Sequence, residues 1–362
     1  MATLATDLSY LERARQGHFD WSWLRSTGSE WGVRARPSRL GLTLRDIAVG
    51  SYGEVPEDPP RRTMAPRGSD VDPDVPDMGY TVNGKVEVWS DNLLDLYEEA
   101  VSRQWSATRD IPWSELPELD PDIEHAMCQL CTVLSEVEMV ASDFPAKWLW
   151  RINHDFVEAK MFLCTQVMDE ARHTEVFRKR ALANGGGLGK AKAVVERFLK
   201  LILDARTYDE GSALMHLLGE GIVLSLFRAG ELIAPSPVEK RIFRLCMQDE
   251  ARHVAYGTMH LRYRLARDPS LAEDFHSYLD QGEEIIGMLF STPEVVEPTA
   301  LLVAGSVEAA EQVGLAGADM LRTRVIEEYL QRCDHAGLPR RGRVQLPDEL
   351  LLGTTALDGA VA

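Results

Sequence analysis

The word DEARH occurs twice in this chain, at residues 169–173 and 249–253. Residues three apart in a helix lie on one face, so each copy presents a glutamate beside a histidine. The two pairs are Glu170 with His173, and Glu250 with His253. Their neighbours on the same faces are apolar, which predicts that both pairs are buried. Because a buried charge is costly unless it is paired or binds a metal, these pairs need partners.

Further carboxylates lie in apolar helical stretches and are candidate partners. LLGEGIVLSLF contains Glu220, and CTVLSEVEMVAS contains Glu136 and Glu138. Glu138 shares a helical face with Cys131 and Leu134, whereas Glu136 lines up with polar residues. We therefore expect Glu138 to face inward, with Glu136 as the alternative.

The spacing of these glutamates predicts two antiparallel helical hairpins. Glu138 and Glu170 lie equally far from residue 154, and Glu220 and Glu250 lie equally far from residue 235 in the predicted turn APSP. Each hairpin then brings a lone glutamate level with a Glu-x-x-His pair, roughly 20 Å from its turn at ~1.5 Å per residue. The two hairpins together would supply four carboxylates and two imidazoles.

This set of residue types is the ligand set of di-iron carboxylate bundles, in which two helices give a Glu and two give a Glu-x-x-His. Oxygen-rich donors suit iron or manganese, whereas zinc would use more histidine or cysteine. Two buried Glu–His ion pairs in a bundle core are the alternative, but they leave the lone glutamates at matching levels unexplained. We expect Glu170 and Glu250 to bridge the ions. The predicted ligands are Glu138, Glu170, His173, Glu220, Glu250 and His253.

The residues around the pairs have predicted supporting roles. A metal-bound histidine usually donates its other ring nitrogen to a carboxylate. Asp169 and Asp249 are therefore expected to reach the histidine of the opposite hairpin, with Arg172 and Arg252 as their charge partners. The predicted pocket walls are Leu163, Phe177, Leu224, Phe227, Phe243 and Cys246.

The elements that must position these residues are long amphipathic helices, which predicts an all-α protein. Residues 89–340 form the expected helical domain, and residues 341–362 the expected tail. Residues 1–88 are expected to form an irregular arm, because residues 54–79 are rich in Pro, Asp and Gly and cannot sustain a helix. Trp21, Trp23 and Trp31 suggest that this arm docks on the main domain.

The composition excludes several classes of partner. The 362 residues carry a net charge of −18, which disfavours nucleic acid and anionic membranes. The start of the sequence contains no signal-peptide pattern, and no apolar run approaches the ~18 residues of a membrane span. The five cysteines are odd in number and lie mostly in helical stretches, which suits a reducing compartment. We expect a cytoplasmic protein.

Over residues 89–265 the chain resembles the ferritin-like di-iron oxygenase and desaturase superfamily. The segments SEVEMVAS, MDEARHTEVF, LLGEGIV and QDEARHVAYG are similar to its four ligand-bearing helices in their usual order. The resemblance implies a ferritin-like four-helix bundle with additional helices, two iron ions with manganese as an alternative at one position, and O2 as co-substrate. It also implies electrons from a reductase or ferredoxin.

The implied activity is hydroxylation or N-oxygenation of an apolar or aromatic substrate, either a small molecule or one bound to a carrier. An acyl-chain desaturase and a non-catalytic iron-storage protein are the alternatives, and a homodimer is left open. Phe177 replaces the radical tyrosine of the ribonucleotide reductase small subunit, which argues against radical storage. Leu224 replaces a threonine of multicomponent hydroxylases, and Cys246 a third histidine of arylamine N-oxygenases. His216 could substitute for that histidine, but a core histidine is the stronger expectation.

Overall fold

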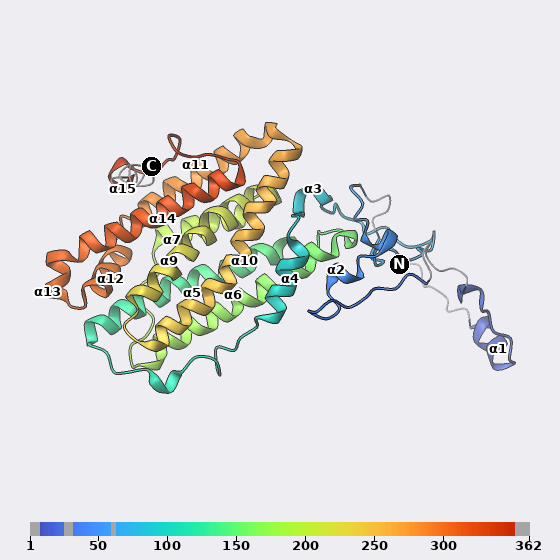
Figure 1. Ribbon diagram of the computed structural model, residues 1–362, viewed down its shortest axis with the longest axis horizontal. Helices are drawn as coiled ribbons and strands as arrows, with labels where there is room; N and C mark the ends of the chain where they lie inside the picture. The colour runs from blue at the N-terminus through green and yellow to red at the C-terminus, as the bar shows by residue number, and fades with distance from the viewer. Residues whose placement is uncertain (1–7, 25–31, 59–62, 352–362) are drawn as a thin grey trace.

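The computed structural model describes residues 8–24, 32–58 and 63–351, and all regular secondary structure within them is helical. This confirms the all-α prediction. Two pairs of long neighbouring helices form the centre of the bundle (Figure 1). They are α5 (Pro121–Leu149) with α6 (Val157–Ala183), and α9 (Glu220–Ile233) with α10 (Pro237–Arg267).

The chain reverses direction where the glutamate spacing predicts. Residues 150–156 join α5 to α6, and residues 234–236 join α9 to α10, so both predicted turns are confirmed. The second turn is well suited to start a helix, because the Ser236 side chain accepts a hydrogen bond from the backbone N–H of Val238 and Pro237 is the first helical residue. Asp120 and Pro121 start α5 in the same way.

Further helices cover the four central ones. Helix α4 packs on α6, α12 on α5, α14 on α9 and α10, and α11 on α7. A π-helical segment, Ala213–Gly219, leads directly into α9. The bounds are α4 (Leu93–Ser102), α7 (Ala193–Asp204), α8 (Tyr208–Ser212), α11 (Ala272–Leu289), α12 (Pro293–Ala304), α13 (Val307–Ala309), α14 (Leu315–Ala336) and α15 (Asp348–Leu351).

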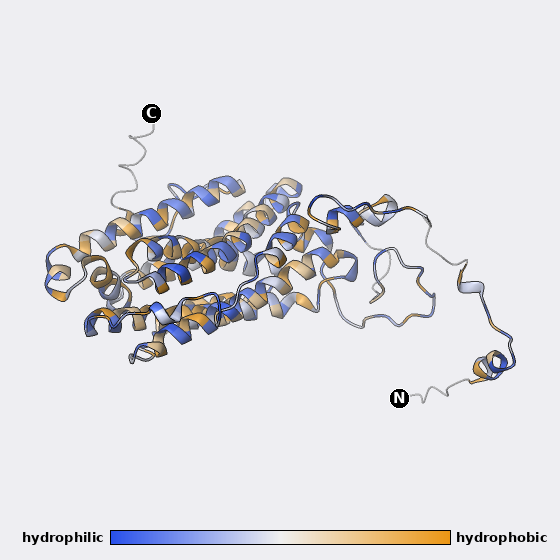
Figure 2. Cartoon of the chain, turned by 60° about the horizontal axis from the view of Figure 1, so that its bottom comes forward, coloured by the Kyte–Doolittle hydropathy of each residue, from blue (hydrophilic) through white to orange (hydrophobic). Residues whose placement is uncertain are grey.

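The segment Tyr208–Ile233 is long and apolar enough to cross a bilayer by composition. In the fold, 83% of its most apolar window is buried against the rest of the chain, which is the position of a core helix. Figure 2 shows hydrophobic and hydrophilic residues alternating along the helices of the bundle.

The apolar core divides into two clusters. One cluster contains Phe144 and Phe162, on the side of the connection between α5 and α6. The other contains Leu134, Phe177 and Phe227. Along α5 and α6 the predicted ligands lie between members of the first cluster and members of the second. The predicted ligands therefore occupy a polar layer between the two apolar clusters.

The N-terminal arm extends from one end of the bundle (Figures 1 and 2) and contains α1 (Ser9–Arg15), α2 (Leu44–Ile47) and α3 (Lys85–Val88). Arg67 ties it to the bundle through an ion pair with Glu158 on α6. Trp21 and Trp23 are 57% and 61% exposed, so the docking prediction is wrong for these two. Trp31 lies outside the described residues.

The residues after the helical domain also pack in part. Leu346 and Leu350 are buried in the core. The completely buried Arg340 joins Glu283 of α11 by an ion pair, so it holds the start of this segment against the bundle. Residues 352–362 lie outside the described part of the chain.

Candidate metal centre

The six predicted ligands come together from all four central helices. Glu138 comes from α5, a Glu-x-x-His pair from each of α6 and α10, and Glu220 from α9. Each side chain is at most 3% exposed. Ligand atoms lie within 4.8 Å of one another in each of two groups, which share Glu170 and Glu250. The groups are Glu138, Glu170, His173 and Glu250; and Glu170, Glu220, Glu250 and His253.

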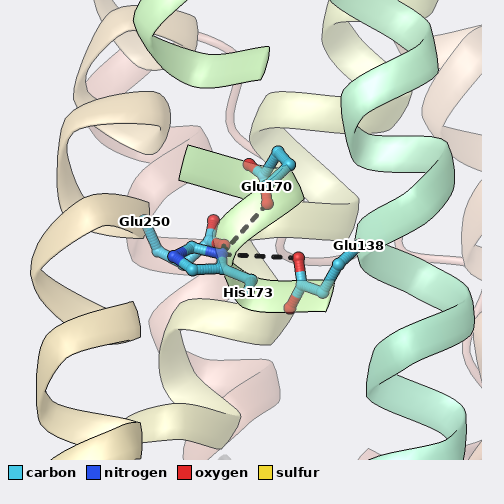
Figure 3. A group of neighbouring side chains, drawn as sticks. All are labelled: Glu138, Glu170, His173 and Glu250. Carbon is cyan, nitrogen blue, oxygen red and sulfur yellow. Dashed lines mark hydrogen bonds and ion pairs between the residues drawn. The ribbon is translucent and has the colours of Figure 1, made fainter. Parts of the chain in front are cut away.

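Both imidazoles turn Nδ1 toward the carboxylates of the predicted glutamate ligands. His173 Nδ1 lies 3.1 Å from Glu170 Oε2, 3.3 Å from Glu250 Oε1 and 3.6 Å from Glu138 Oε2. Figure 3 shows these side chains converging from α5, α6 and α10. His253 Nδ1 likewise lies 2.9 Å from Glu170 Oε1. Each group thus places one imidazole nitrogen among carboxylate oxygens.

Several of these atoms are buried and, although they lie close to one another, form no well-directed hydrogen bond within the described part of the chain. They are Glu138 Oε1, Glu170 Oε1, Glu220 Oε2, both oxygens of Glu250 and His253 Nδ1. Buried polar atoms normally have partners, so such a concentration calls for an explanation. A cation in each group would satisfy all of them at once. The donor set, with four carboxylates and two imidazoles, fits two iron or manganese ions.

The charges of the cluster are strongly coupled. Burial raises the pKa of Glu138 well above its ordinary value, and the negative charge of Glu170 adds to the effect. Burial and the Glu250 charge raise the pKa of Glu220 in the same way. Although burial alone would raise the pKa of Glu170, the charges of His253 and His173 lower it. The cluster therefore holds protons that metal ions would displace.

Each DEARH aspartate reaches the histidine of the other copy. Asp249 Oδ2 lies 3.2 Å from His173 Nε2, and Asp169 Oδ2 lies 3.4 Å from His253 Nε2. An aspartate at Nε2 leaves Nδ1 as the nitrogen available to a metal, because a neutral imidazole donates from one nitrogen and accepts at the other. The two copies are thus linked crosswise.

Two buried guanidinium groups balance the aspartates. Arg172 Nη2 lies 2.8 Å from Asp249 Oδ2, and Arg252 Nη2 lies 2.9 Å from Asp169 Oδ2. The sequence interpretation did not include Trp105, whose indole Nε1 donates to Asp249 Oδ2 at 2.7 Å. Trp105 comes from an irregular segment, so helical periodicity offers no signal for it.

Two more polar residues missed as site residues lie behind Glu220. Gln166 Nε2 donates to Glu220 Oε1 at 2.7 Å, and Gln166 Oε1 lies 3.2 Å from His216 Nε2. Burial, with a further contribution from the charge of His253, lowers the pKa of His216 well below its ordinary value. His216 is thus a neutral core histidine, and Gln166 lies between it and the cluster. Gln166 was visible in the sequence, because it precedes Glu170 by one helical turn.

The structure places Glu138, and not Glu136, in the cluster. Glu136 lines a separate groove of about 720 Å³ beside Glu196 of α7. Burial, and then the negative charge of Glu196, raises the pKa of Glu136. The face shared with Cys131 and Leu134 therefore predicted the inward residue of α5.

The predicted pocket residues divide between a cavity and the packed core. Phe227 and Phe243 line a narrow apolar cavity of about 70 Å³, and the Phe227 ring lies 6.3 Å from the His173 ring. Cys246 is completely buried and touches His173. The remaining three are buried in the helical core: Leu163, Phe177 and Leu224. A substrate-binding role for any of the six stays a prediction.

No protein-family model and no curated protein matches the sequence. Solved structures of R2-like ligand-binding oxidases do match. One variant with an aerobically reconstituted Mn/Fe cofactor aligns with a TM-score of 0.55 at 18% identity, over 68% of this chain and 94% of that chain. Another structure with this cofactor, after a long soak, aligns with a TM-score of 0.53 at 19% identity, over 68% and 93%. This chain has the ferritin-like fold.

Proposed function

We propose that this protein is a two-metal oxidase that uses O2 to oxidise an organic substrate. The observation that carries the proposal is the pair of buried four-residue groups that share Glu170 and Glu250. Shared carboxylates would hold two ions close together, and the ions would supply the redox chemistry with O2. The Mn/Fe cofactor of the structural neighbours supports iron at one position and manganese at the other, and iron at both positions is the alternative.

The residues of this chain would hold and insulate the ions. Asp249 and Asp169 keep the two histidines turned so that Nδ1 faces the carboxylates. The two apolar clusters exclude water from both sides of the polar layer. Exclusion of water strengthens every electrostatic interaction inside the centre and prevents side reactions.

The apolar side chains beside the cluster support an apolar or aromatic substrate. Phe227 lines a narrow apolar cavity and its ring contacts the His173 ring, so this cavity adjoins the cluster. We infer hydroxylation or N-oxygenation, with electrons from a separate reductase or ferredoxin. Desaturation of an acyl chain is the second candidate, because the apolar side chains around the cluster would also suit such a chain.

Metal stoichiometry tests the proposal first. Apoprotein is loaded anaerobically with Fe(II) and analysed for bound metal, as wild type, Glu220→Ala and Glu136→Ala. We expect about two ions per chain in the wild type and in Glu136→Ala, and clearly fewer in Glu220→Ala. Less than one ion in all three proteins would remove the proposal.

Products formed under ¹⁸O2 then separate the two activities. An oxygenase incorporates label into the product, whereas a desaturase removes two hydrogens and incorporates none. A loaded protein that consumes no O2 with any reductant would contradict both.

A further inference from the structure

Behind Glu220 lies a continuous chain of hydrogen bonds. The Ser212 hydroxyl lies 2.8 Å from His216 Nδ1, His216 Nε2 lies 3.2 Å from Gln166 Oε1, and Gln166 Nε2 lies 2.7 Å from Glu220 Oε1. All four side chains are at most 3% exposed.

The direction of these hydrogen bonds is set at the Glu220 end. As a metal ligand Glu220 is ionised and only accepts, so Gln166 turns its amide nitrogen to Glu220 and its carbonyl to His216. His216 must then donate from Nε2 and accept at Nδ1 from the Ser212 hydroxyl. With one orientation of each side chain, all three hydrogen bonds from Ser212 to Glu220 form at once.

Close packing fixes the position of the His216 imidazole within this series of hydrogen bonds. It lies in the π-helical segment Ala213–Gly219, a type of helix that occurs frequently at functional sites. Helix α10 passes so close that a Cβ added at Gly257 would lie 2.2 Å from His216 Cβ. Phe144 and Tyr256 meet the imidazole edge-on, with ring centroids 5.4 and 5.2 Å away.

The opposite lone glutamate has no such support. Glu138 Oε1 has no hydrogen-bond partner in the described residues, and Glu138 Oε2 lies 3.6 Å from His173. The apolar cavity also lies on this side, since its lining includes Leu134, one turn before Glu138, and Phe227, which contacts His173. The two halves of the centre thus differ in both polar support and apolar surroundings.

We propose that Gln166, held by His216 and Ser212, is a positioning residue that fixes Glu220 in one orientation and so makes the two metal positions unequal. The position formed by Glu220 and His253 is the rigid one. The position formed by Glu138 and His173 keeps a carboxylate free to move and faces the substrate. This inference rests on the proposed function, because it requires that the cluster binds two ions.

Titration with Mn(II) tests the inference without any turnover. Free Mn(II) is followed by electron paramagnetic resonance as it is added anaerobically to the full-length apoprotein. We expect two ions per wild-type chain, and a loss of at least about tenfold in affinity for one ion only in Gln166→Leu. Ser135→Ala is the control, because among the described residues its hydroxyl bonds only to the Cys131 carbonyl of its own helix. It should titrate as the wild type.

Variants of His216 give a second route that does not depend on Gln166→Leu folding. His216→Gln retains a donor toward Gln166 and should keep both affinities within about threefold of wild type, whereas His216→Phe should show the selective loss. Co(II) absorption, which reports coordination geometry, should change in His216→Phe and not in His216→Gln. Combining Gln166→Leu with Glu138→Gln should weaken the binding of both ions.

The outcomes separate this inference from the proposed function. A wild type that binds fewer than two ions contradicts the proposed function itself. A wild type that binds two, with Gln166→Leu and His216→Phe also binding both at wild-type affinity, overturns only the role of Gln166. Equal weakening of both ions in a folded Gln166→Leu protein would likewise overturn the claimed inequality.

Discussion

The buried charges around the cluster show what single residues contribute. Asp249 is 1% exposed and meets His173, Arg172, Arg252 and the indole of Trp105. Although burial alone would raise the pKa of Asp249, its hydrogen bond to His173, and then the charges of His173 and the two arginines, lower it. Asp249 is therefore an ionised group that orients the imidazole and is itself balanced.

Replacing Asp249 by asparagine tests this role at the residue scale. An amide can still meet the imidazole, but it carries no charge to balance Arg172 and Arg252. We expect metal affinity to fall by about 10–100-fold, the usual effect of losing such a partner of a ligand. Equilibrium titration with Mn(II) measures it, and unchanged affinity would contradict the orienting role.

Asp209 provides a pH-dependent contribution to stability away from the cluster. Both its oxygens lie 2.9 Å from Arg264 Nε, and Oδ1 lies 3.4 Å from His260 Nε2. Burial alone would raise the pKa of Asp209, but the bonds from His260 and Arg264 lower it below its ordinary value. Its stabilising effect is thus complete above the ordinary pKa of ~4 and is lost as the pH falls through the lower folded-state pKa.

We expect Asp209→Asn to lower the free energy of unfolding by about 1–3 kcal/mol at pH 7. The difference from wild type should shrink as the pH falls below ~4, because the wild-type carboxylate then becomes protonated. Urea unfolding at several pH values measures this. Asp204→Asn is the control, since Asp204 is 60% exposed in its pair with Lys200 and should change stability by less than ~0.5 kcal/mol. A pH-independent difference would contradict the assignment.

At the scale of elements, α10 and the π-helical segment are in close contact next to the cluster. A Cβ at Gly257 would overlap the fixed His216 Cβ, whereas one at Gly221 would meet only the flexible guanidinium of Arg332. We expect Gly257→Ala to destabilise the protein by about 1–3 kcal/mol through overpacking, and Gly221→Ala by less. Chemical unfolding of both variants decides it, and equal costs would contradict this explanation.

Helical periodicity explains which parts of the site were predictable. The ligands, the aspartates and the two hairpin turns follow from spacings of three, four and about thirty residues along helices. Gln166 obeys the same periodicity, and an amide there could have been considered. Trp105 could not be found in this way, because an irregular segment brings it to Asp249.

Other features depend on the packing of distant segments. The six residues predicted as pocket walls are all apolar, yet only two of them line the cavity and the others are buried in the core around it or farther away. Which of them line the cavity depends on how their helices pack, and a local sequence pattern does not predict that packing. The docking of Trp21 and Trp23 was inferred from residue type alone and was wrong, because the arm leaves both exposed.

At the scale of the whole molecule, metal binding and folding should be linked. The raised pKa values of Glu138, Glu220 and His253 mean that the apoprotein holds protons at the cluster. Ions bind only when these protons leave, so we expect stabilisation by Mn(II) of about 2.7 kcal/mol per site at 100 times Kd, falling at any fixed Mn(II) concentration as the pH is lowered. Thermal unfolding with and without Mn(II) measures this. Equal stabilisation of Glu220→Ala would contradict the linkage.

The outer part of the arm should be dispensable for the centre. The described residues 8–24 include none that is buried, whereas Arg67, later in the arm, pairs with Glu158. A protein that begins at residue 33 should therefore bind metal with wild-type stoichiometry. Elemental analysis of the truncated protein checks this, and a loss of metal would show that the arm supports the cluster.

The crosswise pairing of aspartates and histidines has an evolutionary consequence. Each hairpin supplies the carboxylate that orients the imidazole of the other, so a substitution in one DEARH copy is felt at both ion positions. Neither copy can compensate for a substitution in the other, because each histidine depends on the aspartate of the opposite copy. A half-molecule with one hairpin would have ligands but no oriented histidine. Both DEARH copies are therefore needed to orient the two histidines.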